Sequence, residues 1–594
     1  MADDHYRQFV DQAFIDPIRS VLIVDDDYPT FEEMLSMQES SKEWRNQSDR
    51  VLGVIRGFRE RNLLVDIHDC QNVRSATEIA KAEHLHQSDL LVLDYQLDKT
   101  KKGDGTIAID IIRKLMSNSH FNLVVVHTTE NLDAVFEDVI IALLPQEPCE
   151  IKEEDPFEIF EIIQRAKVIV NNFDERLAAA ISRKIYIKLR QVKYRQLIAL
   201  YMKEDVIFND FRGICKEAGW NIKTQHQMLR HQLHLFDKTI IRNPEVLTAK
   251  QIDWSEDTVK WARSDTVFVA FSSKNVGETP LEDLSAALNA WRPDPSRLYL
   301  ARLLYEIEEH GTARQAQVLS DKPALAGWYH AMLTAEDGAT RTQINETIAR
   351  HSERLIKSVG PNVAEFAEQL VKAERGVDAE RPGDAYEICK AHFNIDLTNK
   401  ADLTLARSQH NSVVSTKAPE GWHLTTGHIF KFADRYWVCA SPACDMVPGQ
   451  LSKFRKDIYG ERMPFTAIHL QSVGSMETAL LKATGSRMLF LEIEGKIKAF
   501  SFNDPNDDTS APQWATFFAE KLGALDTTTF EFKIVQVESD DDSRLTVKTH
   551  DAKVVSQLRY EYALNLVQRL GVSMSRIGLD FSAFVPPEVK SKKL

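Results

Sequence analysis

Short apolar runs alternate with longer amphipathic stretches in the first part of the chain, and this alternation most restricts the fold. The apolar runs, typical of buried strands, are VLIV (21–24), LLVDIH (63–68), DLLVLD (89–94) and LVVVH (123–127). The stretches with helical spacing of apolar residues are 48–62, 75–86 and 106–118. This order predicts a parallel sheet covered by helices on both faces, with a ligand site at the carboxyl ends of the strands.

Acidic and hydroxyl side chains follow the predicted strands. Asp25, Asp26 and Asp27 come after the first strand, Asp94 ends the third, and Thr128 closes the fourth. Because parallel strands end at the same edge of a sheet, we expect these side chains to converge on one crevice. Crowded carboxylates repel one another, and a hard divalent cation such as Mg²⁺, which takes oxygen ligands, would relieve the repulsion. The aspartates therefore predict a metal site.

These motifs, in this order, resemble the receiver domains of two-component response regulators. VLIVDDD is similar to the first strand of that family with its acidic pair, and DLLVLDYQL is similar to the third strand with its phosphoacceptor. The resemblance implies a flavodoxin-like, doubly wound α/β domain over residues 1–170. It also implies that Asp94 accepts a phosphoryl group from a histidine kinase. The implied Mg²⁺ ligands are Asp25, Asp26, Asp94 and the Gln96 carbonyl.

Two further positions of the family have counterparts here. LVVVHTT is similar to the fourth strand with its switch hydroxyl, which would be Thr128, with Thr129 adjacent. The lysine at the end of the fifth strand would be Lys152. Three residues before it, where receivers often carry an aromatic side chain, stands Cys149.

A phosphatase of the haloacid dehalogenase type is an alternative for the same segment. Asp25 and Asp27 have the Asp-x-Asp spacing of that family directly after a strand, with Thr30 nearby. Asp25 would then be the nucleophile, and Asp94 would have no role.

The rest of the chain divides by pattern into two parts. Residues 171–395 have mostly helical spacing, which predicts an irregular helical domain. Within them, 265–275 (DTVFVAFSSKN) is either a strand or a loop. Residues 396–594 contain strand-like runs with turns and a helical end, which predicts an α+β domain.

A basic cluster lies near the start of the middle segment, with Tyr186 and Tyr194 among its members. Its cations are Arg183, Lys184, Lys188, Arg190, Lys193 and Arg195. It is a phosphate or nucleic-acid patch, or else the solvated face of a connecting helix, which we favour. The net charge of −15 provides no overall attraction for a polyanion, and we do not expect nucleic-acid binding.

The most distinctive phrase of the C-terminal segment is YWVCASPACDM, which contains Cys439, Cys444 and Asp445, with His423 and His428 upstream. A zinc site and a cysteine nucleophile are both conceivable. The Cys-x₄-Cys spacing differs from the usual short zinc knuckle, so we expect packed thiols beside a turn.

Composition limits the cellular setting. Six cysteines among 594 residues are too sparse for a disulfide framework, and no apolar run is long enough to cross a bilayer. The N-terminus, MADDHYRQFVDQAF, lacks the pattern of an export signal. We expect a cytoplasmic protein without a membrane role.

The sequence thus predicts a response regulator that acts through protein contacts or as a phosphate sink. Large receivers of this kind resemble the buffering regulator of Detocs-type phage-defence phosphorelays, which would add a second response regulator to the partners. One alternative is a receiver that controls hydrolytic or metal chemistry in residues 396–594. The other is a regulator that binds nucleic acid.

Overall fold

The computed structural model describes residues 2–36, 48–68, 88–98, 103–117, 120–144, 149, 151, 153–181, 183–192, 194–203, 205–240, 251–274, 279–319, 322–334, 337–376, 384–448, 452–485, 487–505, 511–539 and 543–575. The chain forms two compact units. The first comprises Met1–Tyr305 and Phe366–Ala373, and the second comprises Glu306–Glu365 and Glu374–Leu594.

The first unit is built on a seven-stranded sheet. The strands, in spatial order, are β2 (Leu64–His68), β1 (Ser20–Val24), β3 (Leu90–Leu93), β4 (Asn122–Thr128), β7 (Val267–Ser273), β6 (Trp261–Arg263) and β5 (Asp253–Ser255). The first five are parallel, and β6 and β5 extend the sheet as antiparallel strands. With β7 as the fifth parallel strand, this is the flavodoxin-like order.

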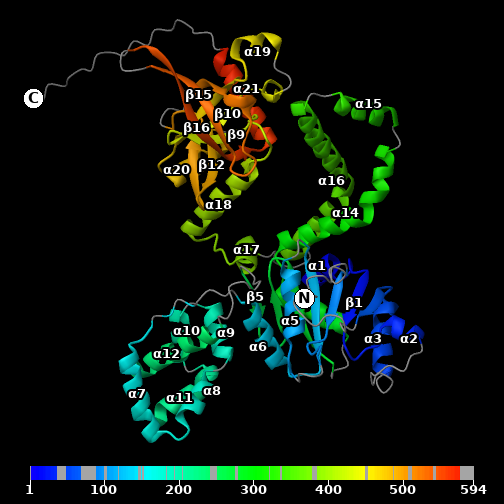
Figure 1. The fold of residues 1–594 in the computed structure, drawn as a ribbon, viewed down its shortest axis with the longest axis vertical. Coiled ribbons are helices and arrows are strands. Elements are labelled where there is room, and N and C mark those ends of the chain that lie inside the picture. Colours follow the sequence, from blue (N-terminus) through cyan, green and yellow to red (C-terminus); the bar gives the residue numbers. More distant parts are fainter. Residues whose placement is uncertain are drawn as a thin grey trace, which may run out of the picture. The chain divides into compact units, whose positions relative to one another are not determined.

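Helices cover both faces of the sheet (Figure 1). They are α1 (Ala2–Phe14), α2 (Phe31–Ser36), α3 (Ser48–Glu60), α5 (Thr106–Met116), α6 (Leu132–Leu143) and α13 (Pro280–Trp291). In β1, Leu22 and Val24 join the apolar core of α5 and α6, whereas Val21 and Ile23 join that of α1, α3 and α13. The alternation follows from the two-residue period of a strand, and it explains why the run VLIV is apolar throughout.

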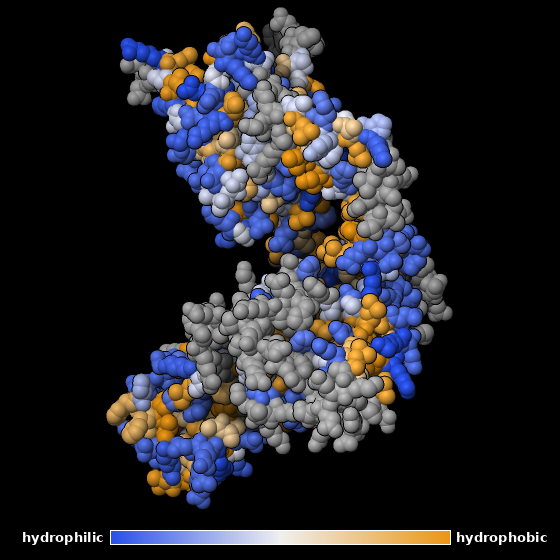
Figure 2. Space-filling view, turned by 45° about the vertical axis from the view of Figure 1, so that its right-hand side comes forward, coloured by the Kyte–Doolittle hydropathy of each residue, from blue (hydrophilic) through white to orange (hydrophobic). Residues whose placement is uncertain are grey.

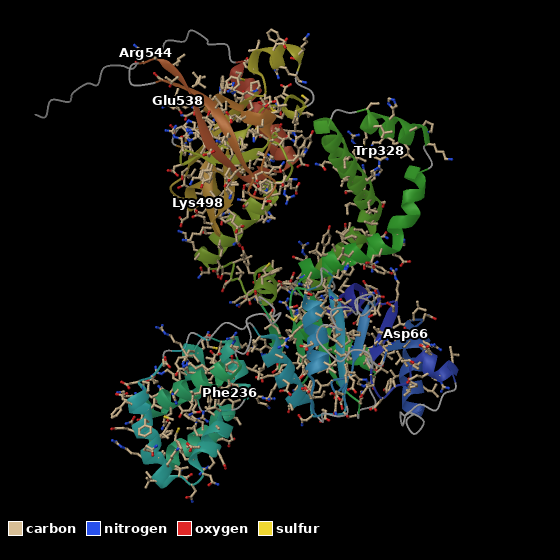
Figure 3. The ribbon with its side chains drawn as sticks, viewed as in Figure 1. Asp66, Phe236, Trp328, Lys498, Glu538 and Arg544 are labelled. Atoms are coloured by element: carbon tan, nitrogen blue, oxygen red, sulfur yellow. The ribbon has the colours of Figure 1, made fainter. Side chains whose placement is uncertain are left out.

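A group of helices between α6 and β5, which we call the helical lobe (156–240), packs beside the sheet (Figure 1). Its elements are α7 (Pro156–Ile169), α8 (Phe173–Ala180), α9 (Arg183–Gln191), α10 (Tyr194–Met202), η3 (Val206–Phe208), α11 (Asn209–Glu217) and α12 (Ile222–Ile240). The rings of Tyr186 in α9 and Phe236 in α12 lie 5.1 Å apart between their centroids. Figure 3 labels Phe236 among the helices of the lobe. Apolar side chains of the lobe share one core with α5 and α6.

The domain boundary predicted at residue 170 is not where the sheet ends. After the lobe, β5, β6 and β7 return to the sheet, and β7 pairs in parallel with β4 along seven positions. The segment 265–275, which the sequence left undecided between a strand and a loop, therefore contains a strand of this sheet. Residues 171–395 are not a separate helical domain. The boundary was misplaced because a short apolar run between helices has no periodicity that separates a strand from a buried loop.

Three long helices follow α13: α14 (Pro295–Leu319), α15 (Lys322–Leu333) and α16 (Asp337–Arg375). Both α14 and α16 contribute residues to each unit. In the first unit, the ring of Phe366 packs edge-on against Phe9 of α1, with 5.5 Å between centroids. In the second, the Asn362 amide donates a 2.7 Å hydrogen bond to the buried Glu306 carboxylate.

The second unit contains a closed antiparallel barrel. Its six strands are β9 (His428–Phe432), β10 (Arg435–Cys439), β11 (Met463–Ser472), β14 (Trp514–Ala519), β15 (Glu531–Ser539) and β16 (Leu545–Leu558). Each pairs with the next, and β16 pairs with β9 to close the barrel. The interior is filled by aromatic rings, including Phe430, Phe465 and Phe517.

Further elements surround the barrel. The strands are β8 (Thr416–Lys417), β12 (Met488–Ile493) and β13 (Lys496–Ser501). The helices are α17 (Ala385–Phe393), α18 (Lys400–Ser415), η4 (Ala443–Met446), α19 (Lys453–Tyr459), α20 (Met476–Leu481), η6 (Ala483–Gly485), η7 (Glu520–Gly523) and α21 (Tyr560–Met574). α21 buries Ala563, Leu566 and Leu570 in a second apolar cluster with Ile429 and Val438. The predicted α+β character of this segment agrees with these elements.

Apolar side chains appear at several separate places on the face seen in Figure 2, among hydrophilic ones. In the described part of the chain, no helix combines the length and the apolar character needed to cross a bilayer.

Candidate functional site

The side chains singled out in the sequence lie at the carboxyl ends of three parallel strands. Asp25 follows β1, Asp94 follows β3 and Thr128 ends β4. One carboxylate oxygen from each of Asp25, Asp26 and Asp94 lies within 4.8 Å of the other two. Asp25 and Asp94 are buried, with 2% and 8% of their surfaces exposed. Of the side chains expected to converge, those of Asp25, Asp26 and Asp94 thus lie together.

A buried lysine that the sequence reasoning missed completes this cluster. The Lys274 Nζ atom lies 2.7 Å from Asp25 Oδ2 and 2.9 Å from Asp94 Oδ2. Its ammonium also faces the ring of Tyr28, at 5.6 Å from the centroid. Lys274 directly follows β7, so the fold places it where the fifth parallel strand ends.

The lysine at the end of the fifth parallel strand is therefore Lys274, whereas the sequence pattern placed it at Lys152. Lys152 lies outside the described residues, and the strand beside β4 is β7 rather than a strand near residue 152. The aromatic position three residues before the lysine falls on Phe271, not on Cys149. The Phe271 ring packs edge-on against Phe136 of α6 at 5.2 Å. The signal was present in VFVAFSSK, an apolar run that ends in lysine.

The electrostatics of the cluster follow from burial. The pKa of Asp94 is raised to about 7: burial is the main cause, Lys274 opposes it, and the neighbouring carboxylates of Asp25 and Asp26 add to the rise. For Lys274, burial works to lower the pKa, but attraction to the two carboxylates outweighs it and raises the pKa above the ordinary value. The cluster thus stores excess negative charge that a cation can offset.

The donor set fits a hard divalent cation. Three carboxylates with mutually close oxygens, two of them buried, are the ligands that Mg²⁺ takes in proteins. Gln96 lies in the loop after β3, half-buried and two residues beyond Asp94. Its role as a carbonyl ligand stays a prediction, as do the roles of the three aspartates.

Thr128 lies in register beside the end of β7. It pairs with Ser273, and its carbonyl accepts a 2.8 Å hydrogen bond from the Lys274 amide. Its hydroxyl, which is buried, accepts a 3.1 Å hydrogen bond from the amide of Glu130. Thr128 therefore links the cluster to the turn that leads into α6.

The structure gives Thr30 and Asp94 contacts that differ from the roles in the phosphatase alternative. The hydroxyl of Thr30 accepts a hydrogen bond from the Glu33 amide, and the Glu33 carboxylate accepts one from the Thr30 amide, which together cap the start of α2. That alternative leaves Asp94 without a role, whereas Asp94 lies in the same cluster as Asp25.

Of the two cysteines expected to be packed thiols in the C-terminal segment, only Cys439 is packed, and the expectation is wrong for Cys444. Cys439 is buried in the barrel interior and Cys444 is exposed in η4. The His428 ring is buried, with Nδ1 accepting from the Thr425 amide and Nε2 contacting the Glu420 carbonyl at 3.1 Å. Among the described residues, Asp25, Asp26 and Asp94 form the one group of three metal-type ligands.

Several cations of the basic cluster are engaged within the chain. Arg183 pairs with Asp138, and Lys184 lies 4.0 Å from Glu137, both acids being in α6. Arg190, with only 10% of its side chain exposed, donates to the Cys149 sulfur at 3.3 Å. Lys193 lies outside the described residues. These pairs lower the charge available for a polyanion.

Five parallel strands in flavodoxin-like order, with aspartates, a threonine and a lysine at their carboxyl edge, define a phosphoacceptor receiver. Residues 17–198 match the family described as the response receiver domain, which shows a receiver domain in this segment of the chain. The matched segment includes β1 to β4 and ends within the lobe, before β7. Comparisons with curated proteins and with solved structures gave no match.

Proposed function

We propose that the protein is a response regulator that accepts a phosphoryl group from a histidine kinase onto Asp94. One observation carries the proposal: Asp94 ends a central strand with its carboxylate beside Asp25, Asp26 and the Lys274 ammonium. An acyl phosphate forms where a carboxylate can attack in line and cations offset the added charge.

In the proposed transfer, a P–O bond forms to the Asp94 carboxylate as the P–N bond of a phosphohistidine breaks and the imidazole leaves. Asp25, Asp26, Asp94 and the Gln96 carbonyl would hold a Mg²⁺ ion, which would supply positive charge to offset that of the phosphoryl oxygens. The Lys274 ammonium, 2.9 Å from Asp94, contributes a second positive charge. The Thr128 hydroxyl donates a hydrogen bond to the phosphoryl group once it is in place.

The phosphorylated protein then acts through altered protein contacts, or it holds the phosphate as a sink beside a second regulator. The anti-phage role belongs to this proposal through the resemblance to Detocs-type buffering regulators, which is fold-level analogy. We do not propose the two alternatives. Cys439 is enclosed in the barrel core, and cations of the basic cluster are paired with acids of the chain.

The test is incubation of the full chain with acetyl phosphate and Mg²⁺, followed by intact-mass measurement and mapping of the label. Wild type should gain one phosphoryl group, and Asp94→Asn, which is nearly isosteric, should gain none. Asp27→Asn, a change of the same kind in the adjacent acidic run, should label as wild type. Label that persists in Asp94→Asn, or that maps to Asp25, would contradict the proposal and support the phosphatase.

A further inference from the structure

The tyrosine that follows the proposed phosphoacceptor connects it to α6. Tyr95 is buried, with 3% of its surface exposed, and it comes directly after Asp94. Its hydroxyl donates a 2.9 Å hydrogen bond to Asp138 Oδ2 in α6. The backbone next to the candidate site is therefore tied to a helix through a side chain with little freedom.

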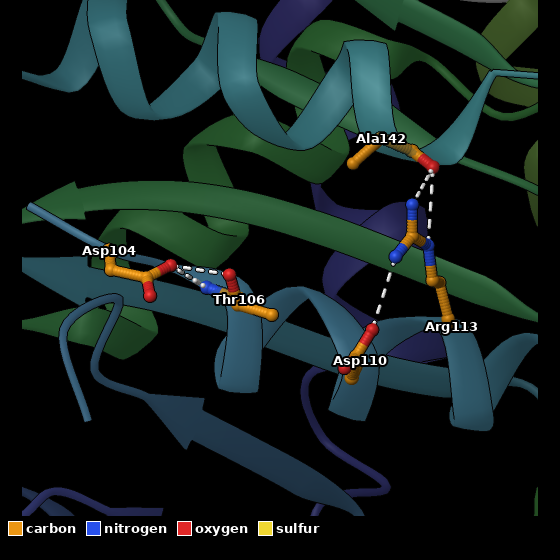
Figure 4. A network of polar contacts seen from close by, with 5 residues as sticks. All are labelled: Asp104, Thr106, Asp110, Arg113 and Ala142. Atoms are coloured by element: carbon orange, nitrogen blue, oxygen red, sulfur yellow. Dashed lines mark hydrogen bonds and ion pairs between the residues drawn. The ribbon is translucent and has the colours of Figure 1, made fainter. Parts of the chain in front are cut away.

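The Tyr95 ring occupies space that is left free because residue 105 is a glycine. A Cβ atom at Gly105 would lie 2.0, 2.2 and 2.7 Å from three carbons of the ring, so no other residue fits there without displacing Tyr95. Asp104, the residue before Gly105, accepts hydrogen bonds from the Thr106 amide and hydroxyl at the start of α5 (Figure 4). The ring thus lies against Gly105, the N-cap residue of α5.

Asp138 continues the connection into the helical lobe. While Oδ2 accepts from Tyr95, Oδ1 pairs with the Arg183 guanidinium at the start of α9. Glu137 lies 4.0 Å from Lys184. The Asp133 carboxylate lies 2.9 Å from the ammonium of Lys260, a residue between β5 and β6. The acidic face of α6, formed by Asp133, Glu137 and Asp138, is matched by cations from the segments packed against it.

The two ends of α6 are fixed differently. At its C-terminal end, the Arg113 guanidinium of α5 donates to the Ala142 carbonyl at 2.7 and 3.2 Å (Figure 4). At the N-terminal side, Asn131 caps α6 by accepting from the Ala134 amide, and the turn before it contains the bond from the Glu130 amide to the Thr128 hydroxyl. If that hydroxyl turns toward a phosphoryl group on Asp94, the bond to Glu130 is lost, which removes one of the hydrogen bonds that fix the start of α6.

We propose that the helical lobe is an internal partner of the receiver, docked on the acidic face of α6 and loosened by phosphorylation through Tyr95, Asp138 and Arg183. This inference rests on the proposed phosphorylation of Asp94. Exposed ion pairs alone contribute little, and the side chains of Arg183 and Asp138 are 50% and 30% exposed. The buried ring of Tyr95 gives the contact its link to the site.

The experiment is hydrogen exchange of the full chain, with and without acetyl phosphate and Mg²⁺, with labelling followed by intact mass in the same samples. In wild type, phosphorylation should speed exchange of the α9 amides by about fivefold, the factor for one hydrogen bond of about 1 kcal/mol. Tyr95→Phe removes only the hydroxyl. It should label fully, show fast α9 exchange already without phosphate, and lose most of the phosphate-dependent change.

A matched pair of charge reversals in the lobe tests its contact with Asp138. Arg183→Glu should behave as Tyr95→Phe does. Arg176→Glu is the control, because Arg176 is similarly exposed and pairs at 2.8 Å with Glu217 inside the lobe. It should keep the phosphate-dependent change in α9.

The outcomes separate the two proposals. Full labelling with unchanged or slower α9 exchange in wild type would overturn the internal-partner inference and leave the phosphoacceptor function intact. A Tyr95→Phe variant that keeps the wild-type change would also overturn it. A protein that takes up no label contradicts the proposed function itself.

Discussion

The Lys274 ammonium donates a 2.7 Å hydrogen bond to the Asp25 carboxylate across 249 residues of sequence. The same nitrogen lies 2.9 Å from Asp94, and the lysine side chain is only 4% exposed. Two buried carboxylates thus share one buried cation. Removing one member of such a group leaves an uncompensated charge, which costs far more than the loss of a surface pair.

We expect Lys274→Met, measured in a chelator, to lower the free energy of unfolding by about 3 kcal/mol. The rate of labelling by acetyl phosphate should also fall steeply, because a positive charge beside the attacking carboxylate is lost. Denaturant titration and intact mass measure the two effects. Lys152→Ala, at the position that the sequence pattern suggested, should change neither quantity; a loss of labelling there would restore the first assignment.

Magnesium should stabilise the first unit. A ligand at a hundredfold excess over its dissociation constant raises the free energy of unfolding by about 2.7 kcal/mol, if it binds only the folded state. Asp26→Asn should remove most of this gain, because it deletes one carboxylate from the cluster. Thermal melts with Mg²⁺ and with chelator measure it.

Asp27→Asn is the matched control for the metal, since the neighbouring residue lies outside the group of close oxygens. An equal magnesium response in the Asp26 variant and in wild type would exclude Asp26 as a ligand. Loss of the magnesium response in the Asp27 variant instead would assign the ligand role to Asp27 rather than to Asp26.

Gly105→Ala should destabilise the first unit by about 1 to 3 kcal/mol, because its Cβ would overlap the Tyr95 ring. Adding Tyr95→Ala should recover part of the loss, since the overlap disappears. Gly213→Ala in α11 is the opposite control: nothing lies within 4 Å of a Cβ there, and alanine should stabilise the helix by up to about 1 kcal/mol. Equal effects of the two alanines on denaturant unfolding would refute the packing argument.

The barrel should lose stability in weak acid. Burial lowers the pKa of His428 to about 4, below the model-peptide value of about 6.5. Between these two pH values the unfolded chain binds a proton that the folded barrel does not, so the free energy of unfolding falls as the pH falls through this window. The loss is at most about 3 kcal/mol for this group and is complete near pH 4.

Urea unfolding at about pH 7 and about pH 5, followed by tryptophan fluorescence, measures this slope. His428→Gln should reduce it even if the variant is less stable at neutral pH. His410→Gln, at an exposed position of α18, should leave it as in wild type. An unchanged slope in the His428 variant would show that its imidazole is not the group responsible.

Local features of the chain carried the correct parts of the prediction. The strands β1, β3 and β4 are continuous apolar runs, and Asp25, Asp94 and Thr128 follow or end them directly. Each of these positions can therefore be found from one short stretch of sequence. Lys274 could not be found in the same way. Its strand comes after a whole helical lobe, and only the pairing of β7 with β4 shows that both belong to one edge.

The barrel shows the same limit. Strand-like runs were visible in this segment, but the pairing of β16 with β9 joins the last strand of the barrel to the first, and no local pattern encodes that closure. Cys439 and Cys444 look equivalent in the sequence, whereas one is enclosed and the other exposed.

Because β7 is synthesised after the whole helical lobe, the order of elements along the chain affects folding during translation. On the ribosome, β1 to β4 and all three aspartates emerge long before Lys274, so the growing chain holds clustered acids without their buried counter-charge. The lobe, translated in between, must fold beside an unfinished sheet whose β4 edge is still open. Shielding of that edge by a chaperone, or slow translation through the lobe, would therefore favour correct assembly.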